Sequence, residues 1–174
     1  MEEQVILVDV NDRELGVAGK LRAHREGALH RAVSVFLFDE EGRFLLQQRA
    51  PSKYHSGGLW SNTCCGHPRP QEEESAAASR RLYEELGVRC AIGPAFRFVY
   101  RALVAPDLLE YEYDHVFFGR YGGEPTPNPD EVADWRWVDS AHLRAEVRDR
   151  PARYSPWFVT CFEQVASLAR ELAF

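Results

Sequence analysis

The sequence predicts an α+β fold in which helices cover a mixed, largely antiparallel sheet. Apolar, strand-like runs lie on both sides of one central helical pattern, and another helical pattern follows the last of these runs. A hydrophobic fraction of 45%, with 12% aromatic residues, is enough to fill a packed core in a chain of 174 residues. We therefore expect residues 1–174 to form a single domain with an α/β/α sandwich architecture.

The first half of the chain predicts a β-hairpin, a loop and a helix. The runs Val33–Phe38 and Arg43–Arg49 flank Gly42, which supplies the turn of the hairpin. A glycine-containing loop follows over Lys53–Trp60. Residues 72–87, EEESAAASRRLYEELG, place alanine and leucine at helical spacing, and the final glycine is a natural helix stop.

The second half predicts three strands and two helices. The strand-like runs are Phe96–Arg101, Leu109–Gly119 and Trp135–Val138, and a helix is expected to begin near Ser140. The last helix opens with Ser155 as N-cap and Pro156 at its first position. Its apolar spacing predicts a buried face made of Phe158, Phe162, Val165, Leu168 and Leu172.

Charge and composition exclude several partners. The net charge of −6 disfavours nucleic acid. No apolar run approaches the ~20 residues that span a bilayer, and the N-terminus does not resemble a secretory signal. We therefore expect a cytoplasmic protein without a membrane partner, monomeric by default. In that compartment the four cysteines are expected to be thiols: Cys64, Cys65, Cys90 and Cys161.

The residues from Gly66 to Val88 follow the pattern G-x5-E-x7-R-x-L-x-E-E-x-G-V. This pattern resembles the Nudix box, a loop–helix–loop module that binds a metal ion and a diphosphate. Ordinary surface ion pairs four residues apart are the alternative interpretation of its charges. One position departs from the pattern, because Arg81 stands where a Nudix hydrolase has glutamate. That change keeps affinity for phosphate and weakens the case for hydrolysis.

Fragments along nearly the whole chain resemble one branch of that superfamily, the type 1 isopentenyl-diphosphate isomerases. They are KLRAH at 20–24, LHRAVSVFLF at 29–38, QQRAPSK at 47–53, LWSNTCCGHP at 59–68, RRLYEELG at 80–87, FVYRA at 98–102, EYE at 110–112 and YSPW at 154–157. The resemblance implies a Nudix-like sandwich and a reversible 1,3-proton shift that converts isopentenyl diphosphate to dimethylallyl diphosphate in isoprenoid biosynthesis. The reaction passes through a carbocation-like state.

The resemblance also implies the proton-transfer residues. Cys65 and Glu112 form the facing pair, Tyr100 orients the glutamate, and Trp157 offers an aromatic wall to positive charge; a core tryptophan at a helix start is the alternative for Trp157. Nearby His67, Lys53 and a metal ion are expected to favour the thiolate of Cys65. The direction of proton transfer between Cys65 and Glu112 stays open, and Cys64 is expected to serve only in packing.

Two metal sites and an anion site complete the implied set. A divalent ion, Mn²⁺ or Zn²⁺, is held by a set of histidines and glutamates: His24, His30, His67, Glu110 and Glu112. The two glutamates are two apart on a predicted strand and so share a face; a solvated sheet face is the alternative. Mg²⁺ uses Glu85 and the diphosphate. The diphosphate contacts are Lys20, Arg49, Lys53 and Arg81, which account for both lysines of the chain.

The other three histidines are predicted to be structural or exposed: His55, His115 and His142. Two rival functions stay open on the sequence. One is a Nudix hydrolase of a nucleoside diphosphate derivative, which Arg81 and the histidine set disfavour. The other is a zinc-binding interaction module built on Cys64, Cys65 and His67, which lacks a second Cys/His pair at ligand spacing.

Overall fold

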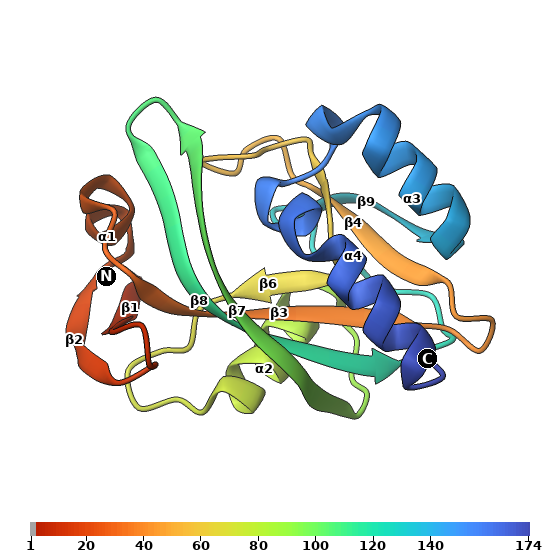
Figure 1. Ribbon diagram of the computed structural model, residues 1–174, viewed down its shortest axis with the longest axis horizontal. Helices are drawn as coiled ribbons and strands as arrows, with labels where there is room; N and C mark the ends of the chain where they lie inside the picture. Colours follow the sequence, from red (N-terminus) through yellow and green to blue (C-terminus); the bar gives the residue numbers. More distant parts are fainter. Residues whose placement is uncertain (1–2) are drawn as a thin grey trace.

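The computed structural model describes residues 3–174 and contains the predicted α/β/α sandwich (Figure 1). The described residues form one nine-stranded sheet. Its strands are β1 (Gln4–Val8), β2 (Glu14–Gly19), β3 (His30–Phe38), β4 (Phe44–Arg49), β5 (Trp60–Ser61), β6 (Cys64–Gly66), β7 (Ile92–Ala105), β8 (Leu108–Arg120) and β9 (Val132–Val138). The helices are α1 (Lys20–Glu26), α2 (Glu74–Leu86), α3 (Ser140–Asp149) and α4 (Pro156–Glu171), with a 3₁₀ turn at Pro151–Arg153. Among these residues no helix is both long and apolar enough to span a bilayer.

Strand β3 organises the sheet. It pairs antiparallel with β6 and parallel with β8, and β8 pairs antiparallel with β7 over nearly its whole length. The other pairings between the named strands are antiparallel, so the predicted mixed, largely antiparallel sheet is confirmed. Strand β4 instead runs beside β9 and β5.

The predicted hairpin exists only at its turn. Strands β3 and β4 share the single pair Phe38↔Phe44 and then diverge. Thr63 lies between them, because its hydroxyl accepts a hydrogen bond from the Leu37 amide and donates one to the Leu45 carbonyl, at 2.8 and 2.7 Å. The Thr63 side chain therefore replaces direct backbone hydrogen bonds between β3 and β4. Strand β6 occupies the space that opens where these two strands diverge.

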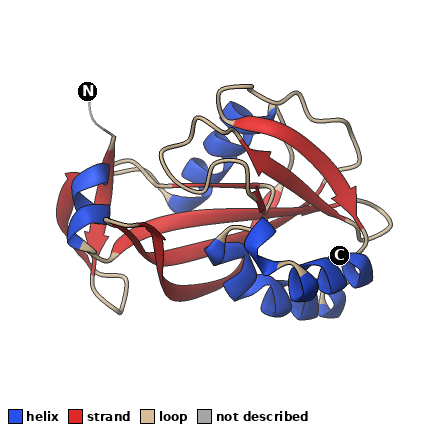
Figure 2. Ribbon diagram, turned by 90° about the horizontal axis from the view of Figure 1, so that it is seen from above, coloured by secondary structure: helices blue, strands red, loops and turns tan. Residues whose placement is uncertain are grey.

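The N-terminal elements were not predicted from the sequence. Strands β1 and β2 form a hairpin that meets β3 at Leu7↔His30, and α1 follows and contacts β8. Gly27 ends α1 in the left-handed conformation (φ 62°), which glycine adopts without strain. Figure 2 shows α1, β1 and β2 at one end of the sheet and the C-terminus at the opposite end. This short helix carries Lys20 and places His24 against Glu110 of β8.

Three helices match their predicted starts or stops. Gly87 caps α2 and Ser140 begins α3. Helix α4 begins at Pro156, although the N-cap Ser155 shares its hydroxyl hydrogen bond with Ser61 (2.8 Å) and not with the helix. The predicted buried face of α4 is wrong at one residue. Leu172 is 53% exposed, because the helix ends at Glu171 and the chain turns away.

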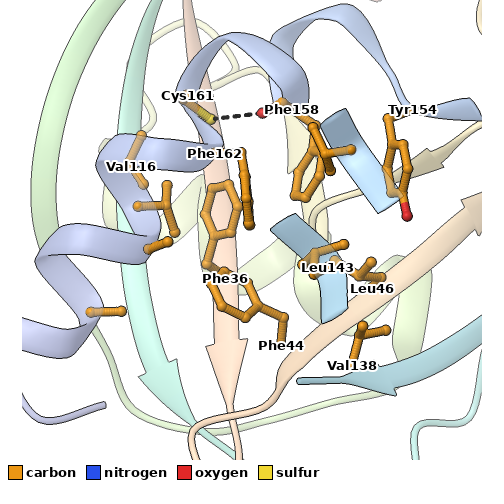
Figure 3. Packing of buried hydrophobic residues seen from close by; sticks show 14 of the residues in the cluster. Phe36, Phe44, Leu46, Val116, Val138, Leu143, Tyr154, Phe158, Cys161 and Phe162 are labelled. Carbon is orange, nitrogen blue, oxygen red and sulfur yellow. Dashed lines mark hydrogen bonds between the residues drawn. The ribbon is translucent and has the colours of Figure 1, made fainter. Parts of the chain in front are cut away.

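The core consists of two layers, one on each face of the sheet. On one face Phe36, Phe44 and Val116 pack against Phe158 and Phe162 of α4 (Figure 3). On the other face, aliphatic residues of β3 and β4 pack against α2; they are Val33, Val35, Leu37 and Leu45. Each fully buried phenylalanine or leucine contributes about 1.5–3 kcal/mol of transfer free energy. This packing fixes β3, β6 and β8, the strands that carry the site.

Candidate active site

One pocket collects residues from both halves of the chain. Its walls come from the N-terminal segment, the loop after β4, strands β6, β7 and β8, and helices α2 and α4. The lining residues are Glu3, Lys20, Arg49, Lys53, Tyr54, His55, Cys65, Gly66, His67, Arg81, Glu85, Tyr100, Glu110, Glu112, Glu131 and Trp157. All the site residues expected from the sequence line this pocket except His24 and His30, which lie directly behind Glu110 and Glu112.

A buried cluster of three histidines and two glutamates lies at the pocket wall. We call His24, His30, His67, Glu110 and Glu112 the His/Glu cluster, and one ligand atom of each lies within 4.8 Å of all the others. Glu110 and Glu112 alternate with outward residues on β8, so both face the interior as predicted. His24 Nε2 is 3.1 Å from Glu110 Oε2, and His67 Nε2 is 2.8 Å from Glu112 Oε1.

The hydrogen bonds of this cluster suit metal ligation. His24 and His30 donate from Nδ1 to the backbone carbonyls of Lys20 and Ala28, at 2.6 and 2.8 Å, so each ring turns the lone pair of Nε2 to the cluster. Three buried cluster atoms have no hydrogen-bond partner among the described residues: His30 Nε2, His67 Nδ1 and Glu110 Oε2. Because no described lysine or arginine forms an ion pair with either glutamate, the donors fit a divalent cation.

The proton-transfer candidates differ in protonation. Burial raises the pKa of the Cys65 thiol to about 12, more than the charge of Arg49 lowers it. In the metal-free protein desolvation outweighs the cationic neighbours of Cys65, so the expected thiolate, which counted on a metal ion as well, stays a prediction for the metal-bound form. Burial and Glu110 would raise the pKa of Glu112, but contacts with His30 and His67 hold it below its usual value. Tyr100 donates a short hydrogen bond to Glu112, as expected for an orienting residue.

Four cationic side chains face the same pocket. Lys20 pairs with Glu3 at 2.9 Å; burial would raise the pKa of Glu3, but Lys20 together with His67 and Arg81 lowers it to about 2. Lys53 and Arg81 both contact Glu131. Arg49 Nε is buried without a partner among the described residues. The four expected anion-binding side chains are thus brought together. An anionic ligand would have to compete with Glu3 and Glu131 for Lys20, Lys53 and Arg81.

The box residues divide into structural and pocket-facing groups. Arg80 pairs with Glu72 through two hydrogen bonds of 2.7 and 2.8 Å and so closes the loop onto α2. The spacing of four residues predicts the ion pairs Arg80–Glu84 and Arg81–Glu85, and both are present; Arg81 also contacts Glu84. A Cβ at position 66 would lie 2.8 Å from Arg81 Cγ, so any larger residue there would have to displace the Arg81 side chain. The glycine that opens the box therefore makes room for the residue that departs from it.

Trp157 is buried, and a hydrogen bond from its indole nitrogen fixes the orientation of the ring. Its Nε1 donates to Asn62 Oδ1 at 3.1 Å, and the guanidinium carbon of Arg49 lies 5.1 Å from the ring centroid. The pocket position expected for this tryptophan is present. One ring face already contacts a cation, which shows that the ring is presented to positive charge.

Sequence reasoning gave no site role to four pocket residues, Glu3, Tyr54, His55 and Glu131. Glu131 was not assigned any role, because it sits in a loop without periodicity. His55 was expected to be structural or exposed; it is buried and lines the pocket, with its Nε2 2.7 Å from Glu110 Oε1, so only the exposed alternative is excluded. The only available signal was its position two residues after Lys53. His115 and His142 were also expected to be structural or exposed. This is confirmed, because His115 pairs with Asp12 and His142 is exposed.

The two adjacent cysteines point to opposite faces of β6. Cys64 packs in the α2 layer and Cys65 lines the pocket, as strand alternation requires. They cannot ligate one ion together with His67, so the zinc module on Cys64, Cys65 and His67 is contradicted. Cys64 serves packing, as expected, and all four cysteines are free thiols.

A sandwich with a diphosphate-type box on its central helix and a metal-suited cluster beside it defines a protein of the Nudix class. The model of the family described as NUDIX domain matches residues 28–158. A solved structure of DR0079 from Deinococcus radiodurans shares the fold with a TM-score of 0.78 at 21% identity, covering 93% of this chain and 98% of that one.

The curated relatives are closer. The protein named Isopentenyl-diphosphate Delta-isomerase 1 of Aromatoleum aromaticum is 59% identical, covering 98% of this chain and 97% of the relative. The Isopentenyl-diphosphate Delta-isomerase of Burkholderia multivorans is 52% identical, covering 94% and 93%. The chain belongs to the Nudix superfamily and, within it, to the type 1 isopentenyl-diphosphate isomerase family.

Proposed function

We propose that this chain, as one domain over residues 1–174, interconverts isopentenyl diphosphate and dimethylallyl diphosphate. The observation that carries the proposal is the meeting of Cys65, Glu112 and four cationic side chains in one pocket. The names of the relatives at 59% and 52% identity support it independently.

The proposed chemistry is a 1,3-proton shift. One group adds a proton to the terminal alkene carbon, and the other removes a proton from the carbon two bonds away, so the net composition is unchanged. Cys65 as a thiol and Glu112 as a carboxylate hold one transferable proton between them, and they exchange roles in the reverse direction. Tyr100 keeps the Glu112 carboxylate in place. The buried ring of Trp157 stabilises positive charge that develops on the substrate.

The diphosphate is proposed to bind Lys20, Arg49, Lys53 and Arg81. Glu131 and Glu3 must release Lys53, Arg81 and Lys20 as the anion binds. Glu85 accepts a hydrogen bond from Gln47 at 2.6 Å and is proposed to hold Mg²⁺ together with the diphosphate. The His/Glu cluster is proposed to hold a second divalent ion, Mn²⁺ or Zn²⁺. When bound, these ions neutralise the carboxylates and the phosphate oxygens.

Hydrolysis is the less favoured chemistry. Arg81 stands where a Nudix hydrolase has glutamate, and its guanidinium contacts Glu84 and Glu85, so the box offers one carboxylate fewer to a cluster of catalytic cations. The proposal therefore predicts rearrangement without release of phosphate. A monomeric state and a cytoplasmic location stay predictions.

The test follows isopentenyl diphosphate by NMR in D₂O with purified protein and Mg²⁺. Formation of dimethylallyl diphosphate with deuterium incorporation is expected. Release of inorganic phosphate, or no change of the substrate signals, would overturn the proposal. Cys64→Ala is a matched control for Cys65→Ala, because the two thiols are neighbours on opposite faces of β6.

A further inference from the structure

His55 is an additional imidazole at the edge of the His/Glu cluster. Its Nε2 is 2.7 Å from Glu110 Oε1, while His24 Nε2 is 3.1 Å from Oε2 of the same carboxylate. Glu110 therefore lies between two imidazoles, with one beside each carboxylate oxygen. His55 does not belong to the set of ligand atoms that lie within 4.8 Å of one another, so it contacts the cluster from outside.

The loop after β4 fixes the orientation of His55. The Arg49 guanidinium donates to the His55 carbonyl at 3.3 Å, and His55 Nδ1 is hydrogen-bonded to the Ser56 hydroxyl at 3.2 Å. The ring packs edge-on against Tyr54 and Trp157, with centroids 4.4 and 5.9 Å apart. Backbone and ring contacts thus leave Nε2 facing Glu110.

This arrangement determines which carboxylate oxygen is available to an ion. Oε1 of Glu110 lies 2.7 Å from His55 Nε2, whereas the buried Oε2 has no hydrogen-bond partner among the described residues and lies on the side of His24. A glutamate carboxylate without a hydrogen bond on Oε1 can rotate about χ3, because the distribution of this torsion angle is broad. Outer partners that prevent such rotation typically contribute 10–100-fold to metal affinity.

We propose that His55 is a positioning residue of the His/Glu cluster, which donates from Nε2 to Glu110 Oε1 and turns Oε2 towards the bound divalent ion. The inference rests on the proposed function only in taking the cluster as a divalent-metal site. It adds a residue outside the five ligands and assigns it an effect on ion affinity.

The test is a Mn²⁺ titration of chelator-treated full-length protein without substrate, with free Mn²⁺ measured by electron paramagnetic resonance. His55→Leu keeps bulk against Tyr54 and Trp157 and removes the donor. It is expected to bind one Mn²⁺ with 10–100-fold weaker affinity. His55→Gln places an amide donor near the position of Nε2 and is expected to stay within about threefold of the wild type, since it restores the hydrogen bond.

Two further variants calibrate the result. His24→Ala removes a ligand and is expected to lose the site. His115→Gln changes a buried histidine–carboxylate pair elsewhere on β8 and is expected to bind Mn²⁺ as the wild type does. If His55→Leu does not fold, as judged by circular dichroism, His55→Ala takes its place with the same expectation.

Unchanged Mn²⁺ affinity in His55→Leu overturns the proposal, and so does complete loss of the site, which would make His55 a ligand. Failure of His55→Gln to recover affinity also overturns it. Turnover of the wild type is measured separately by NMR. A wild type that isomerises its substrate while His55→Leu binds Mn²⁺ normally contradicts only the role of His55. A wild type that binds Mn²⁺ without turnover contradicts the proposed function, and the affinities still decide the role of His55.

Discussion

Two groups of histidine and carboxylate side chains lie on β8 and its neighbours, and they are neutralised differently. The His/Glu cluster joins three histidines to Glu110 and Glu112. The second group, which we call the Arg31 cluster, joins Asp12, Glu74 and His115 around Arg31. Arg31 lies 2.7 Å from Asp12 Oδ1 and 3.2 Å from Glu74 Oε1, and His115 lies 2.9 Å from Asp12 Oδ2.

The difference lies in the charge balance. In the Arg31 cluster a guanidinium already contacts both carboxylates, so little negative charge is left for an ion. In the His/Glu cluster no described lysine or arginine contacts Glu110 or Glu112, and burial is nearly complete. Because an uncompensated buried charge is costly, the His/Glu cluster calls for a bound cation and the Arg31 cluster does not. Similar donor sets thus indicate structure in one place and metal chemistry in the other.

The largest expected contrast is in turnover. Glu112→Gln removes the proposed proton-transfer group, and kcat is expected to fall by roughly 10²–10⁴-fold. Asp12→Asn removes a carboxylate of the Arg31 cluster and is expected to keep kcat, because that group lies outside the pocket. NMR rates under saturating substrate measure both, with circular dichroism as the control for folding. Near-normal turnover of Glu112→Gln would contradict the acid–base assignment.

Metal-dependent stability gives the second contrast. Mn²⁺ at about 100 times its dissociation constant is expected to raise the free energy of unfolding by about 2.7 kcal/mol. Glu110→Gln should abolish this gain, since it removes a ligand charge, whereas Asp12→Asn should retain it. Denaturant titrations with and without the ion measure the difference. Equal stabilisation of the two variants would show that the ion binds elsewhere.

The central fold could be predicted because its signals are local. Gly42 and Gly87 mark turns, Pro156 marks a helix start, and alternation on β8 turns Glu110 and Glu112 to one face. The divergence of β3 from β4 depends on a distant hydroxyl, so no local pattern reveals it. The exposed Leu172 was assigned to a buried face, because apolar spacing continues past the real end of α4.

The site residues were predicted from motif spacing and family resemblance. The differences between that prediction and the structure have physical causes. Box spacing located Arg81 and Glu85 directly. His55 and Glu131 lie in loops, where polarity carries no periodic signal, and only the folded chain brings them to the pocket. The thiolate expected for Cys65 counted nearby positive charge and left out burial, which is the larger effect on its pKa.

The pH dependence of stability sharpens the comparison. Burial lowers the pKa of His67 from 6.5 to about 4, more than Glu112 raises it. The folded protein then binds fewer protons than the unfolded chain between these values, so stability is lost as the pH falls below about 6.5. Between about pH 7.5 and pH 5 this histidine accounts for about 2 kcal/mol of the loss in the metal-free protein. His67→Gln should flatten the profile of unfolding free energy by that amount, and an unchanged profile would contradict the shift.

The smallest expected effect is on the stability of Arg31→Gln. This variant tests directly whether charge balance is what separates the two clusters. Arg31→Gln leaves Asp12 and Glu74 without their guanidinium, at a cost of about 1 kcal/mol, because the carboxylates keep part of their exposure to water. The Arg31 cluster then has two uncompensated carboxylates beside His115, the same balance as the His/Glu cluster. We expect the variant to gain a second, weaker Mn²⁺ site and to recover its lost stability at millimolar Mn²⁺, whereas the wild type binds one. A titration that still shows a single site in Arg31→Gln would mean that ligand geometry, and not charge balance, separates the two clusters.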